Sequence, residues 1–362
     1  MKSFCIQFVV MLLGLLVTPL AWSNGELDPR LNERVIQIPL PDGKNLLATI
    51  FTPDGKGPFP IVVINHGKSL GDPKKQQRFR PIPAATVFVT RGYAVVAPMR
   101  EGFAQSDGKF SLGHCSTLKD GYAQARSIKL TLDFLSGQAW ADPQRILLVG
   151  QSHGGLAAVA FLAAYPDYPG VKGALNFAGG LRARPCAWQQ EMTEAFAAYG
   201  KKAKRPSLWF YAQNDSFFSQ ELVQASFLAY TSAGGQAILV EPGPFKKDGH
   251  QLFSDPQGVS IWWPPSMRFL ERLGMPYQAV DRSFARKDLA LRDQLKTRYV
   301  ERFGEIPERC AKVMDAYFKA NYPKYFVVSD QGNCTASWGP QAKTQSLKAC
   351  EAKNLTGCGY LK

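Results

Sequence analysis

The chain has 362 residues, of which 45% are hydrophobic, and it carries a formal net charge of +14 at pH 7. This apolar content is ordinary for a globular protein with a real core. The length argues against a single small domain and favours one large domain with an appendage.

The first 23 residues have the pattern of a secretory signal peptide. Lys2 precedes an apolar run over residues 8–17, and small residues flank a cleavage point at Ala21-Trp22-Ser23. The run is too short to span a bilayer, which takes about 20 apolar residues. A buried core helix is the alternative interpretation. We expect residues 1–23 to be removed and the protein to be secreted or periplasmic, with no stable membrane span.

Six cysteines remain after residue 23, and an even number in an exported chain predicts disulfides. We expect the pairs Cys115–Cys186, Cys310–Cys334 and Cys350–Cys358, among several possible connectivities. A zinc site is disfavoured, because the spacings lack paired C-x-x-C motifs and no histidine lies near the last four cysteines. An exported chain rarely meets nucleic acid, so we expect the basic charge to give at most weak attraction to anionic surfaces or substrates.

Between about residues 34 and 273 the chain alternates strand and helix patterns, which predicts an α/β domain with a mostly parallel sheet flanked by helices. The strands are expected at residues 35–38, 46–51, 61–64, 93–97, 146–149, 174–177, 208–211 and 237–240. The clearest helices are expected at about residues 122–135, 156–162, 220–230 and 264–273.

The character of the chain changes after Met275-Pro276. Residues 276–362 lack strand–helix alternation and hold four of the six cysteines. We interpret them as a separate cysteine-containing module of unknown role, or as a helical extension that ends in a small disulfide-bonded unit. The expected organisation is a signal peptide at 1–23, a main domain at 24–275 and this C-terminal extension.

The strongest local signal is Gly150-Gln151-Ser152-His153-Gly154-Gly155. A G-x-S-x-G motif indicates a nucleophile when a strand leads into it and a helix leads out, because the serine then sits exposed on a strained turn. The apolar residues 146–149 and 156–162 supply that strand and helix. We therefore predict Ser152 as a nucleophile rather than a structural serine.

A serine nucleophile needs a base, which is usually histidine, and the chain has only four histidines. His66 ends an early strand, His114 precedes the nucleophile, and His153 is adjacent to it. The nucleophile, acid and histidine of this arrangement follow one another in that chain order. His250 is the histidine that comes after Ser152 at a suitable distance.

The acidic partner should lie on a loop after a strand between these two residues. Asp215 fits, and its role would be to fix the imidazole tautomer and stabilise the imidazolium. Asp248 is the second choice, because it lies only two residues from the histidine, and Asp167 is a weaker one. An ordinary Asx-turn is the structural alternative for Asp215.

Two backbone N–H groups should stabilise the negative oxygen of a tetrahedral intermediate. One is expected from His153, directly after the nucleophile, and the other from Lys68, in the loop after the strand at 61–64. Gly67 would let this loop approach closely, and His66 would brace it.

With these residues the chain resembles the dienelactone-hydrolase-like and prolyl-oligopeptidase-like branches of the α/β-hydrolase superfamily, over about residues 35–273. The resemblance rests on the motif at 150–155, on the residues 142–146 that lead to it, and on Arg100-Glu101-Gly102-Phe103 followed by Ser106-Asp107-Gly108. It implies the α/β-hydrolase fold and hydrolysis of an ester, lactone or peptide through an acyl-enzyme, without cofactor or metal. Dienelactone hydrolases proper carry a cysteine where this chain has Ser152. About ten mature residues precede the first strand, which leaves no room for a propeller of the prolyl-oligopeptidase kind.

The leading hypothesis is an exported carboxylic ester hydrolase that acts on a small-molecule ester. A serine peptidase that takes short peptides and a non-catalytic envelope-binding protein are the alternatives. Inserts at residues 103–119 and 181–205 are expected to form the substrate pocket. Apolar walls could come from Phe103, Trp188, Phe217 and Phe218, which could equally be core. Charges expected near the catalytic strand ends, as solvated loops or for an anionic substrate, are Lys68, Arg100, Arg182, Arg184 and residues 201–205.

Overall fold

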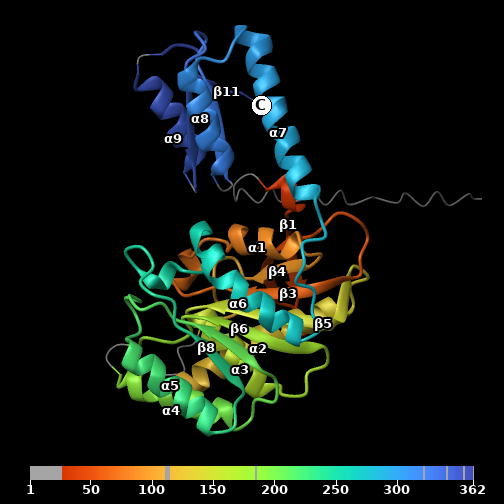
Figure 1. Cartoon of the computed structure of the whole chain (residues 1–362), viewed down its shortest axis with the longest axis vertical. Coiled ribbons are helices and arrows are strands. Elements are labelled where there is room, and N and C mark those ends of the chain that lie inside the picture. Colours follow the sequence, from red (N-terminus) through yellow and green to blue (C-terminus); the bar gives the residue numbers. More distant parts are fainter. Residues whose placement is uncertain are drawn as a thin grey trace, which may run out of the picture.

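The computed structural model describes residues 27–110, 115–183, 186–320, 323–339, 341–353 and 355–361. The expected signal peptide at residues 1–23 lies outside this description, as do His114 and Arg184. The chain forms two sheets, one of eight strands and one of three (Figure 1).

The large sheet has the strand order β1-β2-β4-β3-β5-β6-β7-β8, and all of its pairings from β4 to β8 are parallel. Its first two strands pair antiparallel as a hairpin. The strands are β1 Arg34–Pro39, β2 Asn45–Phe51, β3 Phe59–Asn65, β4 Ala94–Pro98, β5 Ala141–Gln151, β6 Val171–Phe177, β7 Ser207–Phe210 and β8 Ala237–Val240. The predicted mostly parallel sheet is therefore confirmed.

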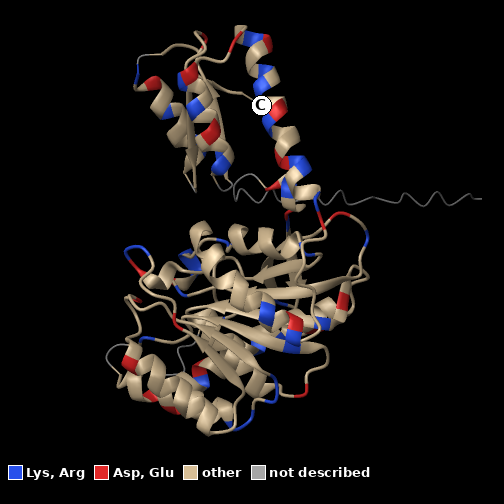
Figure 2. Ribbon diagram, in the orientation of Figure 1, with Lys and Arg blue, Asp and Glu red and all other residues tan. Residues whose placement is uncertain are grey.

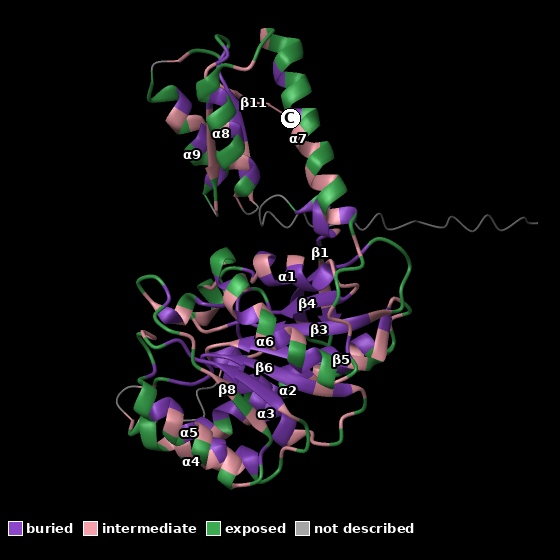
Figure 3. Ribbon diagram, in the orientation of Figure 1, coloured by how far each residue is buried: buried purple, intermediate pink, exposed green. Residues whose placement is uncertain are grey.

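Helices cover both faces of this sheet (Figure 1). One face is covered by α1 Ile82–Val89 and α6 Val259–Arg272, and the other by α2 Thr117–Ser136, α3 His153–Ala164, α4 Trp188–Gly200 and α5 Gln220–Ser232. Alternate residues of a strand point to opposite faces. In β3, Ile61 and Val63 accordingly join the core beneath α2 and α3, whereas Val62 and Ile64 join the core beneath α1 and α6. Figure 3 shows the sheet as the most buried part of the molecule.

The helix predicted at 264–273 begins earlier than expected, at Val259. Prolines favour the first turn of a helix, yet Pro264 and Pro265 lie inside α6. The reason is packing: Trp262 and Phe269, two turns apart, are both buried in the core under this helix. The burial of these two side chains outweighs the hydrogen bonds that the prolines cannot donate.

The C-terminal residues form a small α+β unit, whose strands were not among the elements expected from the sequence. Its elements are α7 Ser283–Phe303, α8 Glu308–Lys319, β9 Lys324–Val328, β10 Cys334–Trp338, α9 Ala342–Glu351 and β11 Gly359–Tyr360, with β9 central in an antiparallel sheet. Met314, Phe326 and Val328 contribute to a core of its own. The three strands are short, and β10 contains small polar residues. None of them therefore gives a clear alternating pattern of apolar and polar residues.

All three predicted disulfides are present: Cys115–Cys186, Cys310–Cys334 and Cys350–Cys358. The last two lie within the C-terminal unit. Many Lys, Arg, Asp and Glu side chains of this unit lie along α7 (Figure 2). None of the helices in the described ranges is long and apolar enough to cross a membrane.

The C-terminal unit is joined to the main domain near the 3-10 helix η1 Pro29–Leu31. Arg30 bridges the two parts, because its guanidinium pairs with Asp28 beside it and with Asp288 on α7. A cavity of about 550 Å³ lies here, lined by residues of η1, α7, α8, β9, α9 and β11. It includes neither Ser152, Asp215 nor His250 among its lining residues.

A buried ion-pair cluster fixes the start of the main domain. The carboxylate of Glu33 is fully buried and accepts hydrogen bonds from Arg78, Arg80 and the backbone N–H of Asp28. Burial alone would raise the pKa of Glu33, but its hydrogen bonds and the charge of Arg80 lower it below the ordinary value. The pKa of Glu33 is therefore lower in the folded state than in the unfolded chain, so ionisation of this group favours folding.

Replacing Glu33 by glutamine should lower the free energy of unfolding at pH 7 by about 3 kcal/mol, because it leaves two buried arginines without their anion. A lowered pKa stabilises the fold above the pKa of the unfolded chain, and this contribution is lost as the pH falls through the folded-state value. The difference between wild type and variant should therefore shrink on acidification. Urea unfolding at pH 7 and pH 3 measures it, with exposed Glu241→Gln as control. Equal stabilities at pH 7 would contradict the prediction.

Candidate active site

Ser152 lies on a tight turn between β5 and α3, with φ 55° and ψ −125°. A side chain in this region of φ is strained, which is typical of a nucleophile at a strand–helix turn. Only glycine fits around it: a Cβ on Gly150 would lie 2.0 Å from the carbonyl oxygen of Gly154, and one on Gly154 would lie 2.1 Å from that of Asn65. The turn thus holds Ser152 at the carboxyl edge of the sheet, as the motif predicts.

His250 lies in the 3-10 helix η3 Gly249–Gln251, which follows β8, and its ring meets Asp215. Its Nδ1 is 2.9 Å from Asp215 Oδ2, and the carboxylate is fully buried while the imidazole is 12% exposed. The backbone N–H groups of Phe217 and Phe218 both donate to Asp215 Oδ1. These donors orient the carboxylate so that its second oxygen faces the imidazole.

Further hydrogen bonds connect the loops around these groups. Gln151, directly before the nucleophile, donates from Nε2 to the carbonyl of His250 at 2.9 Å. Asp248 accepts from the backbone N–H of His250 and from the backbone and hydroxyl of Ser216. Asp248 therefore braces the backbone of both loops, and the structure pairs the imidazole with Asp215. Asp167, the weaker alternative, forms an ion pair with Lys204 at the surface.

The loop after β3 approaches the nucleophile closely. A Cβ on Gly67 would lie 3.3 Å from Ser152 Cβ and 3.8 Å from its Oγ, so the backbone of this loop lies against the serine. The next residue is Lys68, whose ammonium group lies 5.6 Å from the ring centre of Phe110. His153 begins α3, and a first-turn N–H has no acceptor within its own helix. The two predicted oxyanion donors thus lie on segments that flank Ser152.

Aromatic side chains pack against the imidazole of His250. The ring centre of Phe217 lies 4.3 Å from that of His250, and Phe218 contacts the same ring at 5.8 Å. Trp188, at the start of α4, packs against Phe218, and the guanidinium of Arg182 lies near both Trp188 and Phe217. These rings are placed to form an apolar wall.

Only some of the insert residues that were expected to form the substrate pocket lie at the carboxyl edge of the sheet, where Ser152 is. Phe103 is fully buried and packs against His66, so it belongs to the core. The disulfide Cys115–Cys186 does connect the two inserts, since it joins the segment before α2 to the segment before α4.

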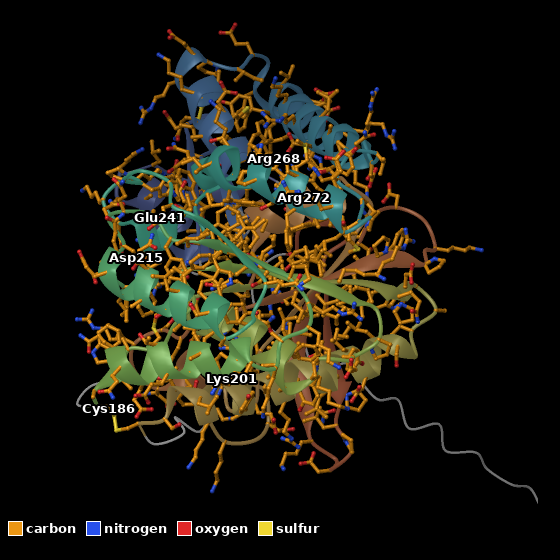
Figure 4. The ribbon with its side chains drawn as sticks, turned by 60° about the horizontal axis from the view of Figure 1, so that its bottom comes forward. Cys186, Lys201, Asp215, Glu241, Arg268 and Arg272 are labelled. Atoms are coloured by element: carbon orange, nitrogen blue, oxygen red, sulfur yellow. A yellow bond between two sulfur atoms is a disulfide. The ribbon has the colours of Figure 1, made fainter. Side chains whose placement is uncertain are left out.

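The expected basic cluster is only partly present on the catalytic side. Arg100 is fully buried rather than solvated. Residues 201–205 lead into the amino end of β7, whereas Asp215 follows its carboxyl end, so they lie at the opposite edge of the sheet. Figure 4 shows Lys201 at the other end of α4 from Cys186, and Asp215 and Glu241 at the edge where β7 and β8 end. Lys68 and Arg182 follow β3 and β6 and remain on the catalytic side.

Sequence reasoning did not predict the buried hydrogen-bonded network beneath the carboxyl edge of the sheet. Arg100, Asp120 and Gln124 are buried and are joined by hydrogen bonds to His66 and His153. The spacing of Asp120 and Gln124, four residues apart on α2, places them on one helix face and was the available signal.

Comparison with known proteins bears on the fold. The X-Pro dipeptidyl-peptidase (S15) family matches residues 42–181. Among curated proteins, none is significantly similar to the chain. An acylaminoacyl peptidase of Pyrococcus horikoshii has a TM-score of 0.51 and 17% identity, over 71% of this chain and 43% of that one. Dipeptidyl peptidase 4 of Porphyromonas gingivalis has a TM-score of 0.50 and 14% identity, over 66% of this chain and 35% of that one.

A protein of Klebsiella pneumoniae described as a dienelactone hydrolase matches at 19% identity and a TM-score of 0.47, over 67% of this chain and 98% of that one. This chain spans less than half the length of the two peptidases. What the matches share with it is the parallel sheet with its flanking helices. The chain therefore has the α/β-hydrolase fold, and its residues 42–181 are similar to the X-Pro dipeptidyl-peptidase (S15) family.

Proposed function

We propose that the protein is an exported serine hydrolase that cleaves a carboxylic ester or lactone through an acyl-enzyme. Ser152 is the nucleophile, His250 the general base and Asp215 the residue that orients the imidazole. The observation that carries the proposal is the pairing of His250 Nδ1 with a buried Asp215 on loops that are hydrogen-bonded to the Ser152 turn. This order of groups is that of a serine-hydrolase triad.

The reaction follows from this arrangement. Asp215 accepts a hydrogen bond from the N–H at Nδ1 of His250 and so keeps the proton of the ring on that nitrogen. The lone pair on Nε2 is then available to take the proton of Ser152 as the serine attacks the carbonyl carbon. The backbone N–H groups of His153 and Lys68 stabilise the oxygen anion. The imidazolium then protonates the departing alcohol, and water hydrolyses the acyl-serine by the same steps in reverse order. Neither half of the reaction requires a cofactor or metal.

A serine peptidase is the second candidate, and the match to the X-Pro dipeptidyl-peptidase family favours it. A peptidase that recognises a free amino terminus needs a carboxylate for the ammonium group. Near the described site, Asp215 is committed to His250, and Asp248 to backbone N–H groups and the Ser216 hydroxyl. Lys68 and Arg182, the cations on the catalytic side of the sheet, would repel an ammonium group. These charges favour the ester hydrolase. A non-catalytic envelope-binding role, the third alternative, would give no reason for a buried Asp215 paired with His250 on a loop that is hydrogen-bonded to the Ser152 turn.

The proposed location is outside the reducing cytoplasm. Three disulfides support it, because such bonds persist mainly in oxidising compartments. The proposed partner is a small-molecule ester, and the apolar wall of Phe217 and Phe218 beside His250 would contact its acyl or alcohol group.

Labelling with a fluorophosphonate, followed by assays on p-nitrophenyl esters and on aminoacyl p-nitroanilides, tests this function. We expect label on Ser152 of the wild type, no label on Ser152→Ala, and turnover of esters. Turnover of the anilides alone would favour the peptidase. Absence of both labelling and turnover would exclude a serine hydrolase.

A further inference from the structure

A single buried side chain contacts both segments that carry the proposed oxyanion donors. Arg100, which follows β4, donates from Nη1 to the carbonyl of His66 at 2.7 Å and from Nη2 to Nδ1 of His153 at 3.1 Å. Its Nε donates to Gln124 at 2.9 Å, and its backbone N–H donates to His66 Nε2 at 3.1 Å. The guanidinium therefore spans the loop after β3 and the start of α3.

These contacts fix the proton positions of two histidines. Arginine can only donate, so His153 Nδ1 must accept, and its proton lies on Nε2, which is 2.5 Å from Asp120 Oδ2. In the same way His66 Nε2 accepts, and its proton on Nδ1 is donated to the carbonyl of Gly67 at 2.7 Å. Burial lowers the pKa of both rings and keeps them neutral.

These hydrogen bonds also set the direction of the oxyanion donors, because a peptide group is rigid and planar. The carbonyl of Gly67 and the N–H of Lys68 belong to one planar peptide and point in opposite directions. Because His66 and Gln76 both donate to that carbonyl, they also set the direction of the Lys68 N–H. The second donor is the backbone N–H of His153, whose own ring is held between Arg100 and Asp120.

We propose that Arg100 is a positioning residue, balanced by the negative charge of Asp120, that fixes the separation of the two oxyanion donors. The inference rests on the proposed function. Buried charges of opposite sign contribute little net stability compared with apolar residues of the same size, so fold stability alone gives no reason for Arg100 and Asp120. What Arg100 supplies is geometry, because no other described side chain bonds to both His66 and His153.

The test is Arg100→Lys, which keeps the charge and loses the fork that bonds both segments. Displaced oxyanion donors weaken the transition state more than bound substrate. We expect kcat for a p-nitrophenyl ester to fall about tenfold to hundredfold, with KM changed by no more than about twofold. The inhibition constant of a trifluoromethyl ketone, whose adduct with serine carries the same anion, should rise in proportion to the fall in kcat/KM.

The matched control is Arg30→Lys, another buried arginine, whose partners Asp28 and Asp288 belong to the junction of η1 with α7 and not to the loops of the site. It should lower the melting temperature and leave kcat per titrated active site unchanged. If Arg100→Lys does not fold, Gln76→Leu at the half-exposed edge of the loop replaces it, with a smaller fall of the same kind expected. Unchanged kcat and ketone affinity in a folded variant would overturn the inference. A wild type that fails to label at Ser152 would instead refute the proposed function.

Discussion

Replacing Ser152 by alanine is expected to lower kcat for ester hydrolysis by about 10⁶-fold. The alanine offers no oxygen to attack the carbonyl, and the remaining groups can only bind and polarise the substrate. Alanine fits the strained backbone at φ 55° no worse than serine does, so the melting temperature should stay close to that of the wild type. Steady-state kinetics and thermal unfolding of the same preparation measure both quantities.

Ser136→Ala is the control for this variant, because that exposed hydroxyl bonds only to a nearby carbonyl at the end of α2. It should retain full activity. Ser152→Ala protein with more than about a hundredth of the wild-type kcat, after removal of contaminating esterases, would show that another residue is the nucleophile.

The fold was largely predictable because its signals are local. Each strand of the large sheet is a short apolar run, and parallel strands buried on both faces have that pattern. The errors occur where packing decides instead. Helix α6 continues through Pro264 because Trp262 and Phe269 fill the core, and the strand β9 was missed because only the C-terminal unit, once folded, buries Phe326 and Val328. Neither fact is visible in a window of neighbouring residues.

The candidate site also has residues that local signals predict and one residue that they do not. Ser152, Asp215 and His250 follow from one motif, chain order and the small number of histidines, and the structure brings the last two into contact. The role of Arg100 could not be predicted, because a lone arginine after a strand is most often a solvated charge. Its burial depends on partners from α2, from the start of α3 and from the loop after β3, which are far apart in the sequence.

Replacing Asp215 by asparagine should lower kcat about 10⁴-fold, because it reverses the tautomer of His250. The N–H groups of Phe217 and Phe218 donate to Oδ1, so asparagine must place its carbonyl oxygen there and its NH₂ group at the Oδ2 position. That NH₂ group would face His250 Nδ1 at the position where the carboxylate accepts at 2.9 Å. The proton would then move to Nε2, which could no longer accept the proton of Ser152.

Two measurements separate this mechanism from a general loss of structure. Nitrogen-15 spectra of the imidazoles should show the proton of His250 on Nδ1 in the wild type and on Nε2 in Asp215→Asn. Asp248→Asn is the matched control: that carboxylate accepts only from the backbone of His250 and from Ser216, so its replacement should leave the tautomer unchanged and lower kcat by about tenfold at most. If Asp248→Asn reduced kcat more than Asp215→Asn, the orienting carboxylate would be Asp248. The ring would then have to leave Asp215 during the reaction, because the loop geometry gives Asp248 the backbone of His250 and gives Asp215 its imidazole.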